Sequence, residues 1–166
     1  MSFKFGPAAA AGAAVAVAMI ATVALAHDDM GPVPNTPAGK AAAARHQNFK
    51  QMGGAFKGIV DQVKKDSPDK AVIAANAAKM NVLAGEAPSW FPKGSGAESG
   101  VKTDAKPEIW SDPQGFAAAV AKLQAATGKL QQVSVAGDMA AIKAQVQATG
   151  GACKNCHETY RVPEKH

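Results

Sequence analysis

Four stretches of this chain carry apolar side chains three or four residues apart, and this helical spacing constrains the fold more than any other feature. No segment alternates between apolar and polar residues, as a half-buried β-strand does. The stretches are separated by short motifs that stop helices: Asp66-Ser67-Pro68, Gly85 and Gly137-Asp138. The sequence therefore predicts an all-α protein, and its 166 residues fit one folded domain.

The boundaries of these helices follow from start and stop signals. Ser67 before Pro68, and Asp112 before Pro113, combine a capping side chain with a proline suited to the first helical turn. We expect the helices over residues 38–65, 67–85, 111–136 and 139–162. Short connections after the first and third helices make antiparallel neighbours, which predicts an up-down-up-down four-helix bundle.

One long loop, residues 86–110, interrupts this pattern. It is rich in proline, glycine and serine, and it contains Trp90, Phe91 and Trp110. Long loops in small domains often carry function. The aromatic side chains could equally well cover the open end of the bundle, and the sequence favours neither interpretation.

Residues 1–26 have the features of a cleaved signal peptide. Lys4 is the only charged residue before Asp28, and the small apolar residues that follow it end in Ala24-Leu25-Ala26, an A-x-A cleavage site. An uncleaved membrane anchor is the alternative. Residues 27–37 read as a flexible, proline-rich lead-in, and residues 38–166 as the folded domain. We therefore expect a periplasmic protein without membrane contact after cleavage.

The charged residues exclude some classes of partner. Lysine and arginine together number 18 against 13 acidic residues, but the excess is scattered and forms no basic run. A nucleic-acid-binding protein would concentrate it in a patch. A mild attraction to an acidic protein, such as a redox partner, remains possible on this charge. No acid/base pair or activated nucleophile is visible, so we do not expect an enzyme.

The motif that carries the chemistry lies near the end of the sequence. Cys153, Cys156 and His157 form C-x-x-C-H, the attachment signature of c-type haem. Residues at positions i, i+3 and i+4 share one face of a helix. Two thiols there can add to the two vinyl groups at one haem edge, while the imidazole turns to the iron. We therefore expect one haem c, with thioethers to both cysteines and His157 as axial iron ligand.

Other uses of the two cysteines are weaker. A structural zinc site needs four ligands, usually including a second Cys/His pair, and a thioredoxin-type dithiol needs a βαβ setting. A disulfide between Cys153 and Cys156 is the remaining alternative in an exported protein. No methionine follows His157, so any second axial ligand must come from earlier in the chain.

Three motifs together resemble one known family. They are residues 153–161 (CKNCHETYR), residues 106–112 (KPEIWSD), and Arg45 followed one turn later by Phe49. The chain resembles the cytochromes c′, or class II cytochromes c, over residues 38–165. The resemblance implies a four-helix bundle with a high-spin, five-coordinate haem, often dimeric through its first two helices.

The same resemblance assigns roles to individual side chains. It implies that Phe49 covers the distal face of the haem and that Arg161 lies beside the proximal imidazole. It implies that Arg45 lies near a haem propionate, and that His46 and Asp104 lie along the haem edge. These roles are expectations carried over from the family.

The distal ligand decides between two functions. Phe49 and Met52 lie about 4.5 Å apart along a helix, so only one of them can face the iron. We favour Phe49 and treat Met52 as packing, which leaves iron open to nitric oxide and carbon monoxide. If Met52 or, less plausibly, His46 binds instead, the protein is a low-spin electron carrier. Phe49 offers no hydrogen bond to stabilise bound dioxygen.

Overall fold

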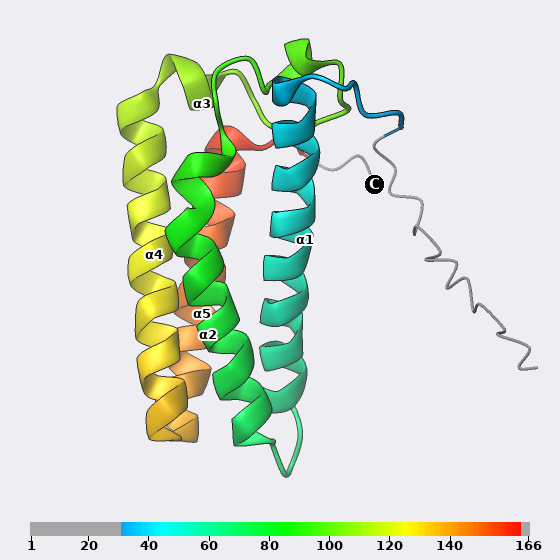
Figure 1. The fold of residues 1–166 in the computed structure, drawn as a ribbon. Helices are drawn as coiled ribbons and strands as arrows, with labels where there is room; N and C mark the ends of the chain where they lie inside the picture. Colours follow the sequence, from blue (N-terminus) through cyan, green and yellow to red (C-terminus); the bar gives the residue numbers. More distant parts are fainter. Residues whose placement is uncertain (1–30, 164–166) are drawn as a thin grey trace, which may run out of the picture.

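Four long helices form an antiparallel up-down-up-down bundle in the computed structural model, which describes residues 31–163 (Figure 1). They are α1 (Pro37–Val63), α2 (Lys70–Glu86), α4 (Pro113–Ala136) and α5 (Met139–Tyr160). Among the described residues the only β pairing is an isolated bridge between Ala105 and Arg161. The predicted fold class is confirmed. The predicted signal peptide, and residues 27–30 of the lead-in, lie outside the described residues.

Each long helix begins at a side chain that caps it. Thr36 accepts a hydrogen bond from Gly39 N at 3.0 Å, and Asp112 accepts one from Gly115 N at 3.0 Å. Asp69 and Asp138 cap α2 and α5 in the same way. Such bonds satisfy backbone amides that have no partner inside the helix. The helix starts are therefore set largely by local sequence.

The start of the second helix was predicted wrongly. It begins at Lys70 rather than at Ser67 and Pro68, because Asp69 supplies the N-cap. One carboxylate oxygen of Asp69 accepts hydrogen bonds from Ala71 N at 2.9 Å and Val72 N at 3.1 Å. The Ser-Pro pair instead lies in the turn between α1 and α2.

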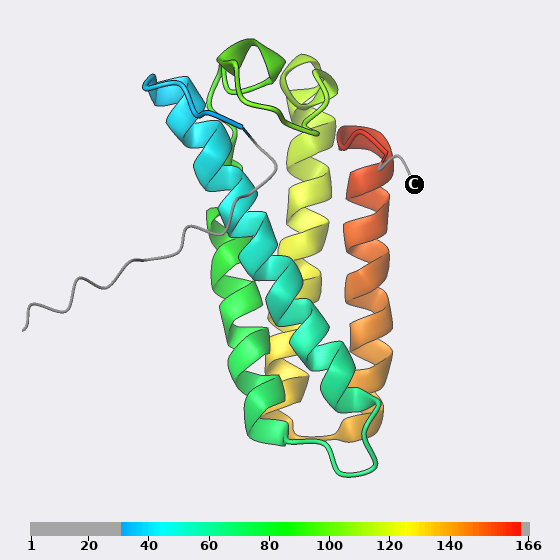
Figure 2. The same ribbon diagram turned by 90° about the vertical axis from the view of Figure 1, so that its right-hand side faces the viewer.

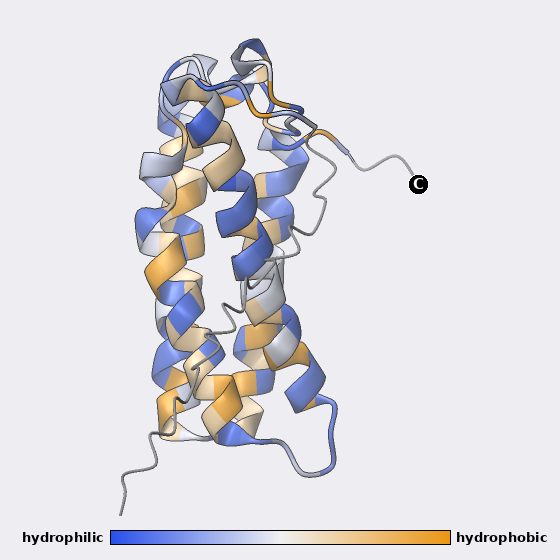
Figure 3. Cartoon of the chain, turned by 45° about the vertical axis from the view of Figure 1, so that its right-hand side comes forward, coloured by the Kyte–Doolittle hydropathy of each residue, from blue (hydrophilic) through white to orange (hydrophobic). Residues whose placement is uncertain are grey.

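The bundle is packed most densely at the end where α1 turns into α2. Fully buried aliphatic side chains from all four long helices meet there and extend toward the middle of the bundle: Ile59, Ile73, Met80, Leu130 and Ile142. Burying one such side chain contributes about 1.5–3 kcal/mol relative to leaving it exposed. Figure 3 shows hydrophobic and hydrophilic residues interleaved along the helices, as expected when each helix buries one face.

The opposite end of the bundle is more open. There α1 leans away from α5, as Figure 2 shows, and the two helices touch far less than α1 touches α2 or α4 touches α5. The long loop covers this end with three short helical segments: Ala87–Trp90, Ala97–Ser99 and α3 (Glu108–Ser111). No helix within residues 31–163 is long and apolar enough to cross a bilayer.

Candidate cofactor-binding site

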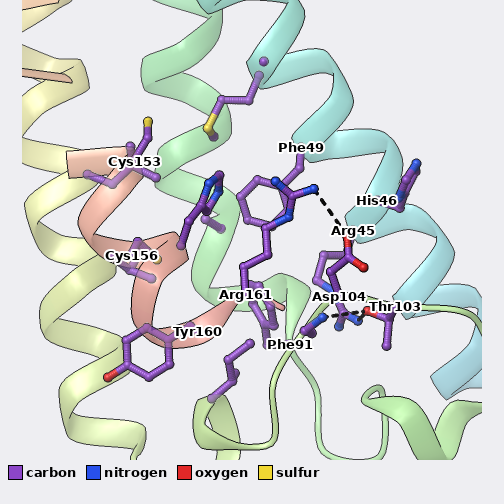
Figure 4. A pocket seen from close by; sticks show the side chains of 18 of the residues that line it. Arg45, His46, Phe49, Phe91, Thr103, Asp104, Cys153, Cys156, Tyr160 and Arg161 are labelled. Atoms are coloured by element: carbon purple, nitrogen blue, oxygen red, sulfur yellow. Dashed lines mark hydrogen bonds and ion pairs between the residues drawn. The ribbon is translucent and has the colours of Figure 1, made fainter. Parts of the chain in front are cut away.

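A cavity of about 680 Å³ lies between α1 and α5 at the open end of the bundle (Figure 4). This volume is within the range of about 300–1,000 Å³ that is usual for ligand pockets. Every residue that the sequence singled out for the site contributes to its lining: Arg45, His46, Phe49, Met52, Asp104, Cys153, Cys156, His157 and Arg161. The fold thus brings together side chains that are more than 100 positions apart in the chain.

The α5 wall of the cavity carries the C-x-x-C-H motif. Cys153 and Cys156 lie one turn apart and are both free thiols. Burial raises the pKa of each thiol, and for Cys156 the neighbouring Cys153 adds to the effect. Both are therefore protonated at neutral pH. Within the described part of the chain, no three His, Cys, Asp or Glu side chains cluster as metal ligands.

The α1 wall is apolar. Phe49 packs edge-on against Trp90, with ring centroids 5.0 Å apart and ring planes at 89°, and it also meets Phe91 at 6.1 Å. Met52 lies on the same wall and belongs to the hydrophobic core, with 5% of its surface exposed. The structure therefore places both candidate distal residues on this wall.

Arg45 is buried one turn before Phe49, with only 4% of its surface exposed. Its two terminal nitrogens donate four hydrogen bonds to the long loop. The acceptors are Trp90 O at 3.3 Å, Ser95 Oγ at 2.9 Å, Ser95 O at 2.8 Å and Thr103 Oγ1 at 3.0 Å. Burial lowers the pKa of the guanidinium, and the nearby Glu98 carboxylate opposes that shift. Arg45 thus ties α1 to the loop, a role that its sequence position did not reveal.

These four bonds bear on the expected propionate contact. Each terminal nitrogen of a guanidinium carries two hydrogens, and the loop already accepts four bonds from that pair. The Nε–H group of Arg45 has no hydrogen bond to the loop among these contacts. The propionate role of Arg45 stays a prediction.

The loop is also joined to the end of α5. Asp104 pairs with Arg161 at 3.3 Å, and Figure 4 shows the Arg161 side chain extending toward it. Backbone bonds run alongside, from Lys106 N to Tyr160 O at 3.0 Å and from Val162 N to Asp104 O at 2.8 Å. Residues 103–106 are therefore held by Arg45 of α1 on one side and by the end of α5 on the other.

The mouth of the cavity is lined by basic side chains. His46, Lys50 and Lys102 are exposed there. The sequence analysis singled out His46 and missed the two lysines, which are ordinary surface residues in the sequence pattern. Basic groups at a cavity mouth suit a ligand with carboxylates at one edge.

Haem has the shape and chemistry that this cavity accepts. It is a flat, largely apolar macrocycle with two vinyl groups and, elsewhere on its rim, two carboxylates. The cavity offers two thiols and an imidazole on α5, an apolar wall on α1 and basic groups at its mouth. The donors present therefore fit a covalently attached haem.

Comparison with known proteins leads to the same group. A family model described as Cytochrome C′ matches residues 40–161. The cytochrome c′ of Rubrivivax gelatinosus is 38% identical over 124 residues, which cover 74% of this chain and 95% of that protein. Its crystal structure aligns with a TM-score of 0.69 at 37% identity, over 75% of this chain and 96% of the other.

Solved structures of a second relative carry gas ligands. Two variants of cytochrome c prime from Alcaligenes xylosoxidans were solved with nitric oxide and with carbon monoxide bound. Each is 30% identical to this chain, with a TM-score of 0.69 over 76% of this chain and 97% of theirs. By its matched length, its relatives and its fold, the chain belongs to the cytochrome c′ family, whose members carry one covalently attached c-type haem.

Proposed function

We propose that this protein binds nitric oxide and carbon monoxide at a haem iron for which His157 is the only protein ligand. The observation that carries the proposal is Phe49, which has no atom able to bind a metal and lines the cavity on α1, facing the helix that bears the haem motif. The gas complexes of the Alcaligenes xylosoxidans relative support the same class of ligand.

The chain's side chains have distinct roles in this proposal. Cys153 and Cys156 form the two thioethers, and His157 supplies the axial nitrogen. Arg161 brings positive charge to the proximal side, which disfavours imidazolate character at His157, and Asp104 holds it in place. The bound haem supplies an iron that changes oxidation state by one electron and binds diatomic gases reversibly.

The apolar α1 wall selects the ligand. Phe49 keeps the space small and excludes water, so a gas must displace the ring in order to enter. Phe49 offers no hydrogen bond donor to a bound dioxygen molecule, so nitric oxide and carbon monoxide are favoured. Single-electron transfer is compatible with the same site.

A low-spin electron carrier with Met52 as sixth ligand is the second candidate. Met52 lines the cavity, and methionine sulfur binds haem iron in many cytochromes. Against this reading, Met52 is buried within the hydrophobic core cluster. Any shift of this side chain toward a metal would be at the expense of those core contacts, which is costly.

Export and assembly are further parts of the proposal. Cleavage after Ala26 would release the protein into the periplasm. A homodimer through α1 and α2 is proposed from the resemblance to the family, whose members are often dimeric through these two helices. A redox protein is the remaining partner proposed.

Two measurements on the exported protein test the proposal. Intact mass in denaturant should equal the chain from His27 plus one haem, and the optical spectrum should be high-spin in both oxidation states, with a shift when carbon monoxide meets the ferrous form. A bare chain with a Cys153–Cys156 disulfide, from a host with working haem maturation, would overturn the attachment. Sharp α and β bands with no carbon monoxide shift would instead establish a low-spin, six-coordinate iron, and conversion to high spin in Met52→Ala would then identify Met52 as the sixth ligand.

A further inference from the structure

We propose that Trp90 is a positioning residue for gas binding, which sets how readily Phe49 yields to an entering ligand. The inference rests on the proposed function, because it requires Phe49 to stand where the gas binds. It concerns the resistance of Phe49 to displacement, which the identity of Phe49 alone does not determine.

The contact between the two rings is specific. Their centroids lie 5.0 Å apart and their planes stand at 89°. Edge-to-face aromatic pairs are favourable at this separation, beyond the area that they bury. Phe49 therefore loses a directional contact when its ring moves.

The backbone of Trp90 is hydrogen-bonded to a side chain of α1. Its carbonyl oxygen accepts a hydrogen bond from Arg45, which lies one helical turn before Phe49. The residue ends the short helical segment Ala87–Trp90, and 7% of its surface is exposed. Because the Trp90 backbone is bonded to Arg45 and its side chain is buried, we expect displacement of the Phe49 ring to break the contact between the two rings.

Trp90 has no direct access to the ligand. Phe49 is among the described residues that line the cavity, and Trp90 is not. Any influence of the indole on gas entry is therefore indirect, and we expect it to pass through Phe49, which the indole contacts ring to ring. This separates a positioning role from a direct steric one.

The second tryptophan of the chain provides a matched control. Trp110 also lies at the open end of the bundle, donates a hydrogen bond from Nε1 to Phe91 O at 3.1 Å, and packs against Phe91 with centroids 6.3 Å apart. It makes no ring contact with Phe49 among the described aromatic pairs. Trp110→Leu thus removes an indole of the same size without touching the Phe49–Trp90 pair.

The experiment is a double-mutant cycle on carbon monoxide association. Flash photolysis of the ferrous holoprotein would compare wild type, Trp90→Leu, Phe49→Ala, the double variant and Trp110→Leu. We expect Trp90→Leu to speed association by about 2- to 10-fold, the value of one aromatic pair, and Phe49→Ala to speed it more. In the Phe49→Ala background the Trp90 substitution should have no effect, and Trp110→Leu should match wild type.

A crystal structure of the gas-free Trp90→Leu holoprotein gives a second readout. Phe49 should occupy more than one rotamer there and a single one in wild type. If Trp90→Leu fails to fold, Trp90→Phe keeps a smaller aromatic edge and should give a smaller acceleration that again vanishes without Phe49.

The outcomes separate this inference from the proposed function. An unchanged rate in Trp90→Leu, with a faster rate in Phe49→Ala, overturns the inference and leaves the function standing. An effect of Trp90→Leu that persists without Phe49, or equals that of Trp110→Leu, also overturns it. If Phe49→Ala leaves the association rate unchanged, Phe49 is not the gate and the inference fails while gas binding stands. If the ferrous wild-type protein binds no carbon monoxide, the proposed function fails and the inference fails with it.

Discussion

Arg45 is the one buried charged side chain among residues 31–163. Its four hydrogen bonds reach the carbonyl and hydroxyl of Ser95, the carbonyl of Trp90 and the hydroxyl of Thr103. A guanidinium presents its donors in a rigid fork, so one side chain satisfies acceptors that point at it from different directions. At the residue scale, the position of the loop over the cavity depends on this fork.

Replacing Arg45 with lysine should therefore destabilise the holoprotein. A lysine ammonium is a single point that cannot reach all four acceptors, and buried acceptors left without donors cost about 1–3 kcal/mol each. We expect Arg45→Lys to lower the free energy of unfolding by about 2–4 kcal/mol, measured by denaturant titration.

Arg161→Lys is the matched control, since these are the two arginines of the chain. Arg161 pairs with Asp104 at a partly exposed position, where ion pairs contribute about 0–1 kcal/mol. Equal losses in the two variants would show that the buried fork has no special role.

Prediction from sequence succeeded for some of these residues because their signal is local. The two cysteines and His157 lie within five positions and share a helix face. The acceptors of Arg45 lie 45 to 58 residues away from it, so no short pattern announces them. The same holds for the contact between Phe49 and Trp90, which joins a helix to a loop.

At the scale of elements, one carboxylate joins the start of α4 to the end of α5. Asp112 caps α4 by accepting from Gly115 N at 3.0 Å, and its other oxygen accepts the hydroxyl of Tyr160 at 2.9 Å. A side chain on Gly115 would collide with the Asp112 carboxylate and the Tyr160 hydroxyl, so it would displace this junction. The junction fixes the end of the helix that carries the haem motif.

Asp112→Ala should destabilise the holoprotein more than Asp138→Ala does. Asp138 caps α5 through Ala140 N and Ala141 N alone, and loss of such a cap costs about 1 kcal/mol. Asp112→Ala loses a cap and also the tyrosine contact. Thermal unfolding of both variants measures the difference.

Tyr160→Phe completes this comparison. It should destabilise the wild type, yet have no further effect in the Asp112→Ala background, because its partner is already gone. Additive losses would mean that the hydroxyl acts through a different contact.

The bounds of the long helices could be predicted from the sequence better than the short helices of the loop. Helical periodicity and capping residues located α1, α4 and α5 closely. The start of α2 was wrong because two capping candidates, Ser67 and Asp69, lie close together and Asp69 is the one that caps the helix. The short helices of the loop were missed because the loop is held largely by contacts to α1 and α5 rather than by its own sequence pattern.

At the scale of the whole molecule, the bundle combines a dense end with a hollow one. The dense end supplies the aliphatic core, while at the hollow end α1 and α5 face each other across the cavity with few direct contacts. The fold class could be predicted because periodicity determines it. The separation of α1 from α5 could not, because it depends on packing between distant segments.

Removal of the haem should therefore loosen the entire bundle. We expect Cys153→Ala combined with Cys156→Ala, purified without haem, to keep much of its helical signal but to melt without cooperativity. Circular dichroism in the far and near ultraviolet measures both properties. Cys153→Ala alone, which keeps one attachment, should melt cooperatively, and a cooperative melt of the haem-free double variant at the wild-type temperature would contradict the expectation.

The burial of the two motif thiols bears on whether haem attachment comes before or after the docking of α5. A thiol reacts mainly as thiolate, and burial keeps Cys153 and Cys156 protonated in the packed bundle. We therefore expect the chemistry that joins them to the prosthetic group to be fastest on a chain whose last helix has not yet docked. On this expectation maturation precedes final packing, and a chain that packs first is the slower substrate for attachment.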